Sequence, residues 1–485
     1  MSRRKKKLPL ITEAEVTDIA KGGRAIARKD ELVILVTHAV PGDIIDIQLT
    51  KRKRNYYEGR PVHFHTFSSY RTDPACTHFP LCGGCKWQDM TYEAQLRYKE
   101  KQVTDQMMRL AGLPEDIKDK ILPILGAEEP WHYRNKLEFT FSDRRWMTPE
   151  EIASGQPVRE PALGFHVAGR FDKILDITQC HLQPEPSNAI RNFIREFTLR
   201  NGYPYFNIRE QEGLMRNLII RTTRTGEVMV ILSFFRDEQD RIIRLLEAVK
   251  EQFPEITSLQ YVINPKGNDT LEGLEVQVFH GKDHILETLD GLSFRISPQS
   301  FFQTNTHQAE NLYRTVLEFA KVTKKDNVYD LYSGTGTIGL FLTPHARQVI
   351  GIESVAGAVA DARKNARLNK ITNALFIEGD ARELFKEPLF EKYGRPDVVI
   401  LDPPRAGVNP AVVTMLLKQL PRKIVYVSCN PATQARDMQD LLEAYTPEKI
   451  RPVDMFPHTD HVENVVVLKR AMSSSFALQA SEDEE

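Results

Sequence analysis

The residue best suited to act as a reactive group is Cys429, which directly follows an apolar run and begins a polar turn. A thiolate is an effective nucleophile, and backbone dipoles at a strand end, or a nearby arginine such as Arg405 or Arg436, favour its formation. The alternative is a small core residue, which is the commoner role of a cysteine after an apolar strand. The local sequence therefore leaves both roles open.

A carboxylate and two histidines in the polar segment 458–463 form the next candidate group. Glu463 ends this segment, and only Asn464 separates it from a following apolar strand. A sheet edge could therefore hold the carboxylate rigidly, which suits a general base. His458 and His461 could serve as metal ligands or bases, but two histidines in a loop more often position other groups.

The other four cysteines form a separate pattern. Cys82 and Cys85 enclose two glycines that let the backbone turn tightly, and Cys76 and Cys180 complete the set of thiols. Four thiolates fill a closed metal site, and both zinc and an iron–sulfur cluster accept such ligands. We therefore predict a metal at these four residues, which leaves Cys429 as the thiol free for catalysis.

Composition is that of a soluble globular protein. Of 485 residues, 41% are hydrophobic and 27% are charged, and the length suggests about three domains. The sequence contains no apolar run long enough to span a membrane, and no apolar stretch follows the basic start at 1–7 as in a secretory signal. The odd number of cysteines argues against a disulfide framework. We expect a cytoplasmic, monomeric protein without a membrane partner.

Three regions that differ in their pattern of predicted strands and helices indicate a multidomain α/β fold. Residues 1–66 contain short strands separated by glycine and proline turns, which predicts a small β-barrel. Residues 67–295 hold the cysteine segment, a helical stretch, and alternating runs that predict a central antiparallel α+β domain. Residues 296–472 alternate strand and helix, which predicts a doubly wound, Rossmann-like parallel sheet.

Charge is distributed unevenly, although the net charge is −1. The first 60 residues carry 14 lysines and arginines against 8 acidic residues, and the basic run 51–54 precedes Tyr56 and Tyr57. Basic side chains beside aromatic rings suit phosphate contact and base stacking, although a solvated basic face is an equally good interpretation of the run alone. The acidic end, 473–485, is expected to be a disordered tail.

A glycine-rich turn at 330–339 indicates a site for a nucleoside cofactor. Glu353 ends the next strand about 20 residues later, where an acidic side chain can hold ribose hydroxyls. Asp380 and Asp402 end two further strands, so that carboxylates gather at one edge of the sheet. The glycines also match the dinucleotide pattern, which makes NAD the competing cofactor. Asp402 and Cys429 at neighbouring strand ends argue against NAD.

Three motifs in order, at 402–407, 426–433 and 456–463, resemble the signatures of the RNA 5-methyluridine methyltransferase family. The resemblance implies methylation of uracil at C5, with Cys429 adding to C6 and Glu463 removing the C5 proton. It also implies S-adenosylmethionine as the methyl donor, in contact with Gln303, Tyr332, Thr337, Glu353, Asp380 and Asp402. Relatives often have cysteine in place of Ser333, a loop change that leaves the chemistry untouched.

Two further resemblances concern the first half of the chain. The four-cysteine pattern resembles family members that carry a [4Fe–4S] cluster, and the barrel resembles the OB-like TRAM RNA-binding domain. Together they resemble enzymes of 23S ribosomal RNA more than those of transfer RNA, which implies 23S rRNA as the partner.

The alternatives are the same reaction on transfer RNA, a non-catalytic cluster-carrying RNA-binding protein, and methylation of cytosine at C5. The intact pair of Cys429 and Glu463 argues against an idle protein. Cytosine-C5 enzymes commonly have a second nearby cysteine, which this chain lacks.

Overall fold

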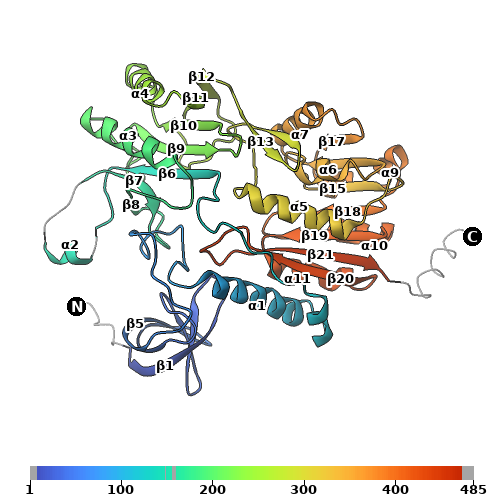
Figure 1. Cartoon of the computed structure of the whole chain (residues 1–485), viewed down its shortest axis with the longest axis horizontal. Helices are drawn as coiled ribbons and strands as arrows, with labels where there is room; N and C mark the ends of the chain where they lie inside the picture. Colours follow the sequence, from blue (N-terminus) through green and yellow to red (C-terminus); the bar gives the residue numbers. More distant parts are fainter. Residues whose placement is uncertain (1–7, 148, 156–159, 472–485) are drawn as a thin grey trace, which may run out of the picture.

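The chain folds into a barrel, a central domain and a C-terminal domain, and segments of all three meet near the centre of the molecule (Figure 1). The computed structural model describes residues 8–147, 149–155 and 160–471. The basic start at 1–7 and the expected disordered tail at 473–485 lie outside these residues. Within the described ranges, every helix is too short or too polar to cross a membrane.

The N-terminal barrel closes in the strand order β1-β2-β3-β5-β4. Ile45, Ile47 and Leu49 of β4 point inward and are buried, and the residues between them are partly exposed, as expected for a strand with one buried face. The predicted small barrel is confirmed. Its strands are β1 (Leu10–Ile19), β2 (Ala25–Lys29), β3 (Leu32–Val36), β4 (Ile44–Arg52) and β5 (Tyr57–Thr66).

The central domain is a seven-stranded sheet in the order β12-β11-β10-β9-β6-β7-β8, with α3 and α4 against one face. The predicted α+β architecture is confirmed, but the expectation of a wholly antiparallel sheet is wrong. β10 and β11 are parallel, because α4 carries the chain back to the same end of the sheet. The elements are β6 (Lys136–Ser142), α2 (Pro149–Ala153), β7 (Ala162–His166), β8 (Ile174–Asp176), α3 (Ser187–Arg200), β9 (Met215–Thr222), β10 (Val228–Phe234), α4 (Gln239–Gln252), β11 (Ile256–Ile263) and β12 (Val276–Gly281).

The C-terminal domain has a seven-stranded sheet in the order β17-β16-β15-β18-β19-β21-β20. The first five strands in that order are parallel, and β21 and β20 are antiparallel to their neighbours, so the predicted Rossmann-like sheet is confirmed. The strands are β15 (Asn327–Leu331), β16 (Gln348–Glu353), β17 (Ala374–Glu378), β18 (Val398–Leu401), β19 (Lys423–Ser428), β20 (Tyr445–Val453) and β21 (Glu463–Arg470). The helices are α5 (Thr306–Ala320), α6 (Thr337–Leu342), α7 (Ala356–Leu368), α8 (Ala381–Leu384), α9 (Glu387–Tyr393), α10 (Pro410–Gln419) and α11 (Pro431–Leu441).

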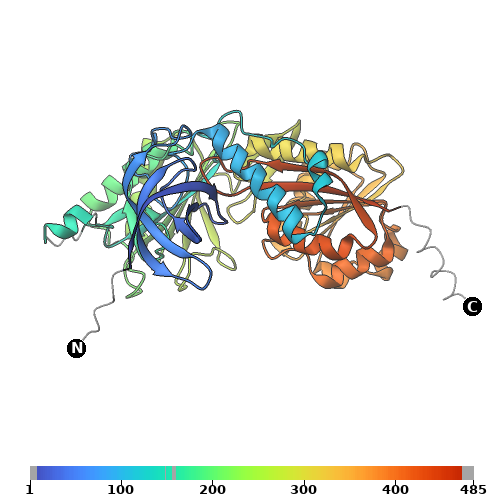
Figure 2. The ribbon, with the colours of Figure 1, turned by 90° about the horizontal axis from the view of Figure 1, so that it is seen from below.

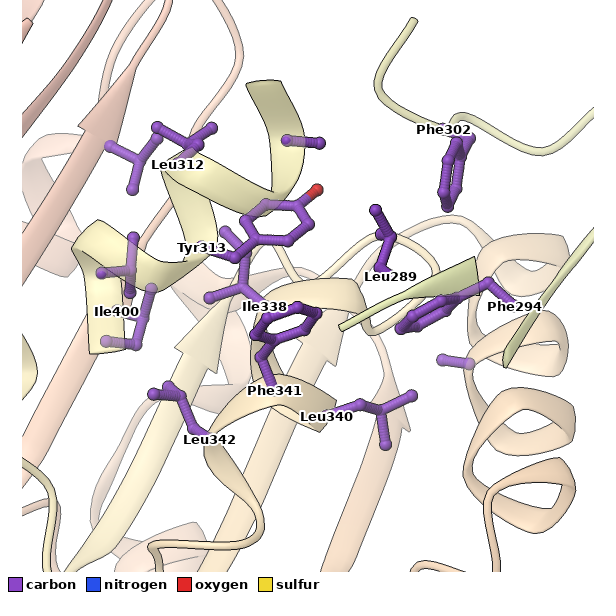
Figure 3. Close-up of a cluster of buried hydrophobic side chains, with 14 of the residues drawn as sticks. Leu289, Phe294, Phe302, Leu312, Tyr313, Ile338, Leu340, Phe341, Leu342 and Ile400 are labelled. Carbon is purple, nitrogen blue, oxygen red and sulfur yellow. The ribbon is translucent and has the colours of Figure 1, made fainter. Parts of the chain in front are cut away.

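Two connecting elements tie the domains together. Helix α1 (Tyr92–Leu110) leaves the barrel and lies across the C-terminal domain (Figure 2), where Val103 and Met107 share a core with Met438 of α11; the short helix η1 (Glu115–Lys120) follows it. The hairpin β13 (Ile285–Leu289) and β14 (Leu292–Ile296) lies against α7, where the Arg295 N–H donates to Asn365 Oδ1 at 2.8 Å. Its Leu289 and Phe294 belong to the same apolar core as residues of α5 and α6 (Figure 3). These contacts bury apolar surface between segments that are distant in the chain.

Candidate active site

Cys429 and Glu463 lie opposite each other at the end of two antiparallel strands. Ser428, the last residue of β19, pairs with Asn464 of β21. Because the strands are antiparallel, Cys429, which follows Ser428, and Glu463, which precedes Asn464, are neighbours. β18 flanks β19 on its other side and ends one residue before Asp402. The structure therefore brings the predicted nucleophile, the predicted base and one predicted cofactor carboxylate to one edge of the sheet.

The carboxyl groups at this edge ionise less readily than exposed ones. Burial, with a contribution from the charge of Asp402, raises the pKa of Glu463 to about 8. Burial also raises the pKa of Asp402 to about 7. The pKa of Asp330, at the end of β15, is raised to about 8 by burial and then by Asp402. Such a group of buried carboxyls favours a cationic ligand, and each is a stronger base than an exposed carboxylate.

The thiol of Cys429 is only partly exposed and lies beside negative charge. Burial, followed by the charge of Glu463, raises its pKa to about 11, and Arg405 opposes this shift through its charge and a hydrogen bond. Arg436 instead binds Asp437, with Nη2 2.6 Å from Oδ1. Of the two arginines left open by the sequence, Arg405 is therefore the one that favours the Cys429 thiolate.

The glycine-rich turn after β15 is tied to the end of β16. Gly334 and Gly336 have φ of 54° and 80°, a conformation that favours glycine. The Gly334 N–H donates to Glu353 Oε2 at 3.0 Å, and Glu353 Oε1 accepts from the Val355 N–H at 2.8 Å. The carboxylate predicted to hold ribose hydroxyls therefore lies directly beside the turn.

The remaining residues predicted to contact the cofactor lie at element ends. Tyr332 begins the glycine-rich turn with a positive φ of 67°, Thr337 is the first residue of α6, and Asp380 caps α8. Gln303 lies just before α5, and its backbone carbonyl accepts from Asn135 Nδ2 at 2.9 Å. These positions leave the side chains at the ligand-binding ends of helices and strands.

The four remaining cysteines line one cavity of about 400 Å³ between the first loop after the barrel and the central sheet. Each is a free thiol, and Cys180 is buried while the other three are half-buried. In the part of the chain that the structure describes, no group of three or more His, Cys, Asp or Glu side chains is arranged so that it could hold a metal ion. The thiols therefore share a cavity without closely surrounding one point.

Three consecutive residues, 134–136, that lie at the cysteine cavity or contact Gln303 were not identified from the sequence. Arg134 and Lys136 line the cysteine cavity together with Thr304, which follows Gln303. Asn135 binds the Gln303 carbonyl from the central domain. A mixed aromatic and basic run directly before β6 was the available signal, but its partners lie far away in the sequence.

The parallel sheet, the glycine-rich turn and the carboxylates at one sheet edge define the class of this protein as a Rossmann-like α/β fold with a site for a nucleoside cofactor. Residues 219–471 match the model of the tRNA (uracil-5-)-methyltransferase family, and the chain belongs to that family. Membership makes it an RNA methyltransferase that uses S-adenosylmethionine.

Relatives match almost the whole chain. An uncharacterized RNA methyltransferase of Porphyromonas gingivalis is 52% identical over 94% of this chain and 99% of its own length, and one of Bacteroides thetaiotaomicron is 50% identical over 93% and 100%. Among solved structures, the tRNA (uracil-54, C5)-methyltransferase of Pyrococcus abyssi in complex with S-adenosyl-L-homocysteine is similar. Its TM-score is 0.73 at 28% identity, with 94% of this chain and 100% of that chain covered.

Proposed function

We propose that this protein transfers a methyl group from S-adenosylmethionine to C5 of a uridine in RNA, through a covalent bond between Cys429 and C6 of the base. The observation that carries the proposal is the position of Cys429 opposite Glu463 at the end of two paired strands. A nucleophile and a base side by side are what substitution at C5 of uracil requires.

The reaction begins when the Cys429 thiol releases its proton to solvent, with Arg405 stabilising the thiolate. The thiolate adds to C6, and the electron pair of the C5–C6 bond moves into the enolate at C5 and the C4 oxygen. C5 forms a bond to the methyl group as the methyl–sulfur bond breaks. Glu463 then removes the C5 proton, the double bond re-forms, and the thiolate of Cys429 leaves C6.

The residues at the sheet edge fit a cationic nucleoside cofactor. S-adenosylmethionine supplies the methyl group through a positively charged sulfonium. We propose that Asp402 faces that charge, that Glu353 and Asp380 hold ribose and adenine, and that Gln303, Tyr332 and Thr337 complete the contacts. Burial raises the pKa of Asp402 to about 7 and that of Asp330 to about 8, so a cation beside them would favour their ionised forms.

The nucleophile is tested with RNA that contains 5-fluorouridine. Fluorine at C5 cannot be removed as a proton, so the wild-type protein should accumulate an adduct that survives denaturing electrophoresis. Cys429→Ala should form none, and Cys429→Ser should form little, because a hydroxyl is far less nucleophilic. An equally stable adduct with Cys429→Ala would overturn the assignment.

For the cysteine cavity we propose a [4Fe–4S] cluster, with zinc as the alternative. Zinc with four thiolates needs every sulfur within about 2.3 Å of one point. The four thiols line one cavity of about 400 Å³, which has room for the larger group. All four side chains are sulfur ligands, a donor set that iron–sulfur clusters prefer.

For the substrate we propose 23S ribosomal RNA, with the barrel at 1–66 and the central domain at 67–295 binding the RNA and residues 296–472 binding the cofactor. Transfer RNA is the second candidate, because the Pyrococcus abyssi enzyme is similar over 94% of the chain. A match of that extent includes part of the barrel, so a barrel does not by itself separate enzymes of the two RNAs. Mapping 5-methyluridine by mass spectrometry in both RNAs from a deletion strain decides between them.

A further inference from the structure

The loop that joins β20 to β21, residues 454–462, lies where segments of the whole molecule converge (Figure 1). The N–H groups of Lys86 and Trp87, in the cysteine segment (residues 70–90), both donate to the His458 carbonyl, at 2.8 and 3.1 Å. From the central domain, Trp131 stacks on the His458 ring with centroids 3.8 Å apart. The loop therefore contacts parts of the chain that bind neither cofactor nor uracil in the proposed reaction.

Gln95 of α1 contacts both the loop and the residues that follow Cys85. Its side chain is completely buried, and its Oε1 accepts from the His458 N–H at 2.8 Å. Its Nε2 donates to the carbonyls of Trp87 and Met90, both at 2.9 Å, and lies 3.3 Å from His458 Nδ1. One amide thus joins the cysteine segment to the loop.

One turn further along α1, Lys99 holds the start of the same loop. Its Nζ lies 2.6 Å from Asp454 Oδ1 and donates to the Phe456 carbonyl at 3.0 Å. Both charged side chains are completely buried, and Tyr92 donates its hydroxyl to Asp454 Oδ2 at 3.0 Å. A buried pair with this many hydrogen bonds fixes geometry more than it adds stability.

The other end of the loop reaches the reacting groups. His461 Nδ1 lies 3.4 Å from Arg405 Nη2, and the Arg405 carbonyl accepts at 3.0 Å from Nδ2 of Asn430, the residue next to Cys429. Immediately after the loop, Glu463 begins β21. The Arg405 backbone is thus held from the Cys429 turn, and its guanidinium contacts the loop at His461.

Resting on the proposed function, we propose that Gln95 and Lys99 are positioning residues: they hold the 454–462 loop so that His461 keeps Arg405 beside Cys429. They touch neither cofactor nor uracil. Through them, the packing of the cysteine segment and α1 against the loop sets how readily the thiolate forms. The charged groups that face Cys429 are Glu463, Asp402 and Arg405. Those around His461 are Asp460, Arg405, Lys86 and Lys99.

The test compares Gln95→Met with Gln102→Met, the same change at a half-buried glutamine two turns along the same helix. The readout is the rate of adduct formation between the full-length protein and a 5-fluorouridine transcript of 23S rRNA or tRNA, measured in reactions of seconds from pH 7 to 12, a range that includes the pKa of about 11 of Cys429. Gln95→Met should slow adduct formation about tenfold at neutral pH and move the midpoint of the pH profile upward, because Arg405 no longer stabilises the thiolate. Gln102→Met should match the wild type.

Loss of fold alone would not move the pH midpoint of the remaining active protein, so the midpoint separates positioning from stability. If Gln95→Met does not fold, His461→Ala at the loop surface gives the same comparison and should raise the midpoint as well. Wild-type midpoints for folded Gln95→Met or for His461→Ala would overturn the inference. Failure of the wild type to form any adduct would instead overturn the proposed function.

Discussion

At the scale of single residues, the site combines one thiol and several carboxyls that change each other's ionisation. Glu463 and Asp402 both raise the pKa of Cys429, and Asp402 raises that of Glu463. A base with a pKa of about 8 accepts the C5 proton more strongly than an exposed glutamate, at the expense of being ionised in fewer molecules at neutral pH. Arg405 is the cation that keeps this negative edge compatible with a thiolate.

Glu463→Gln should trap the enzyme on ordinary RNA. The amide keeps the shape of the side chain but cannot accept the C5 proton, so addition of Cys429 and methyl transfer proceed while elimination stops. Turnover should fall by roughly 10²–10⁴-fold, the usual contribution of a general base. Mass spectrometry should find RNA covalently bound to Cys429 and carrying one methyl group. Free 5-methyluridine at the wild-type rate would show that another group removes the proton.

The affinity for S-adenosylmethionine should rise with pH from 6 to 8.5. Asp402 has a pKa of about 7 and Asp330 of about 8 because both are buried, so they are largely neutral below those values. The sulfonium favours the ionised carboxylates, so binding releases protons. The affinity should therefore rise at most about tenfold per pH unit for each of the two groups. S-adenosylhomocysteine carries a neutral sulfur and should show a shallower dependence by calorimetry. Equal slopes for the two ligands would contradict this electrostatic account.

At the scale of elements, parallel strands make the site possible, because their carboxyl ends lie at one edge. The glycine-rich turn must leave β15 and enter α6 within a few residues, and its backbone does so through three positive φ angles, at Tyr332, Gly334 and Gly336. The antiparallel strand β21 then adds Glu463 from the opposite direction, next to the end of β19. The nucleophile and base consequently come from strands that run in opposite senses.

Gly336→Ala should damage this turn more than Gly334→Ala. A Cβ on Gly336 would lie 2.6 Å from Cζ of the buried Phe376, whereas a Cβ on Gly334 meets open space. Both changes carry the cost of a side chain at positive φ, about 1–2 kcal/mol, and crowding adds about 1–3 kcal/mol at Gly336. Chemical denaturation should show this difference in the free energy of unfolding. Equal losses of stability for both variants would mean that the Phe376 ring moves aside without destabilising the fold.

At the scale of the whole molecule, the methyltransferase domain depends on parts of the chain that lie hundreds of residues earlier. Gln95 and His458 are 363 residues apart in the sequence and share a hydrogen bond. α1 packs on α11 by apolar residues, so the helix belongs to the C-terminal core as well as to the cysteine segment. The C-terminal domain and the segments that precede it in the chain are therefore packed together.

The cysteine cavity gives a prediction at this scale. Cys180→Ser should lose most of the iron and sulfide found in protein prepared without oxygen, because one ligand of four is missing. Cys429→Ser should retain the wild-type content, since Cys429 lies at the other site. Metal analysis with a sulfide assay provides both numbers. One zinc per chain and no sulfide in the wild type would end the cluster proposal.

Several local features of the site could be predicted from short motifs. Each of Asp402, Cys429 and Glu463 adjoins an apolar strand within a short motif, and strand ends of a parallel sheet gather at one edge, so these residues could be grouped before the structure was known. The barrel and the glycine-rich turn followed in the same way from residue spacing and turn residues. Such inferences succeed because each depends on neighbours within a few residues.

Only the tertiary structure decided the contacts between distant segments. It selected Arg405 over Arg436 as the partner of Cys429, because the register of strands and helices, and not sequence proximity, sets which guanidinium reaches the thiol. It showed that β10 and β11 are parallel, which alternation of residues does not report. It also revealed Gln95 and Lys99, whose partners lie more than three hundred residues away, because packing joins residues that sequence patterns treat as independent.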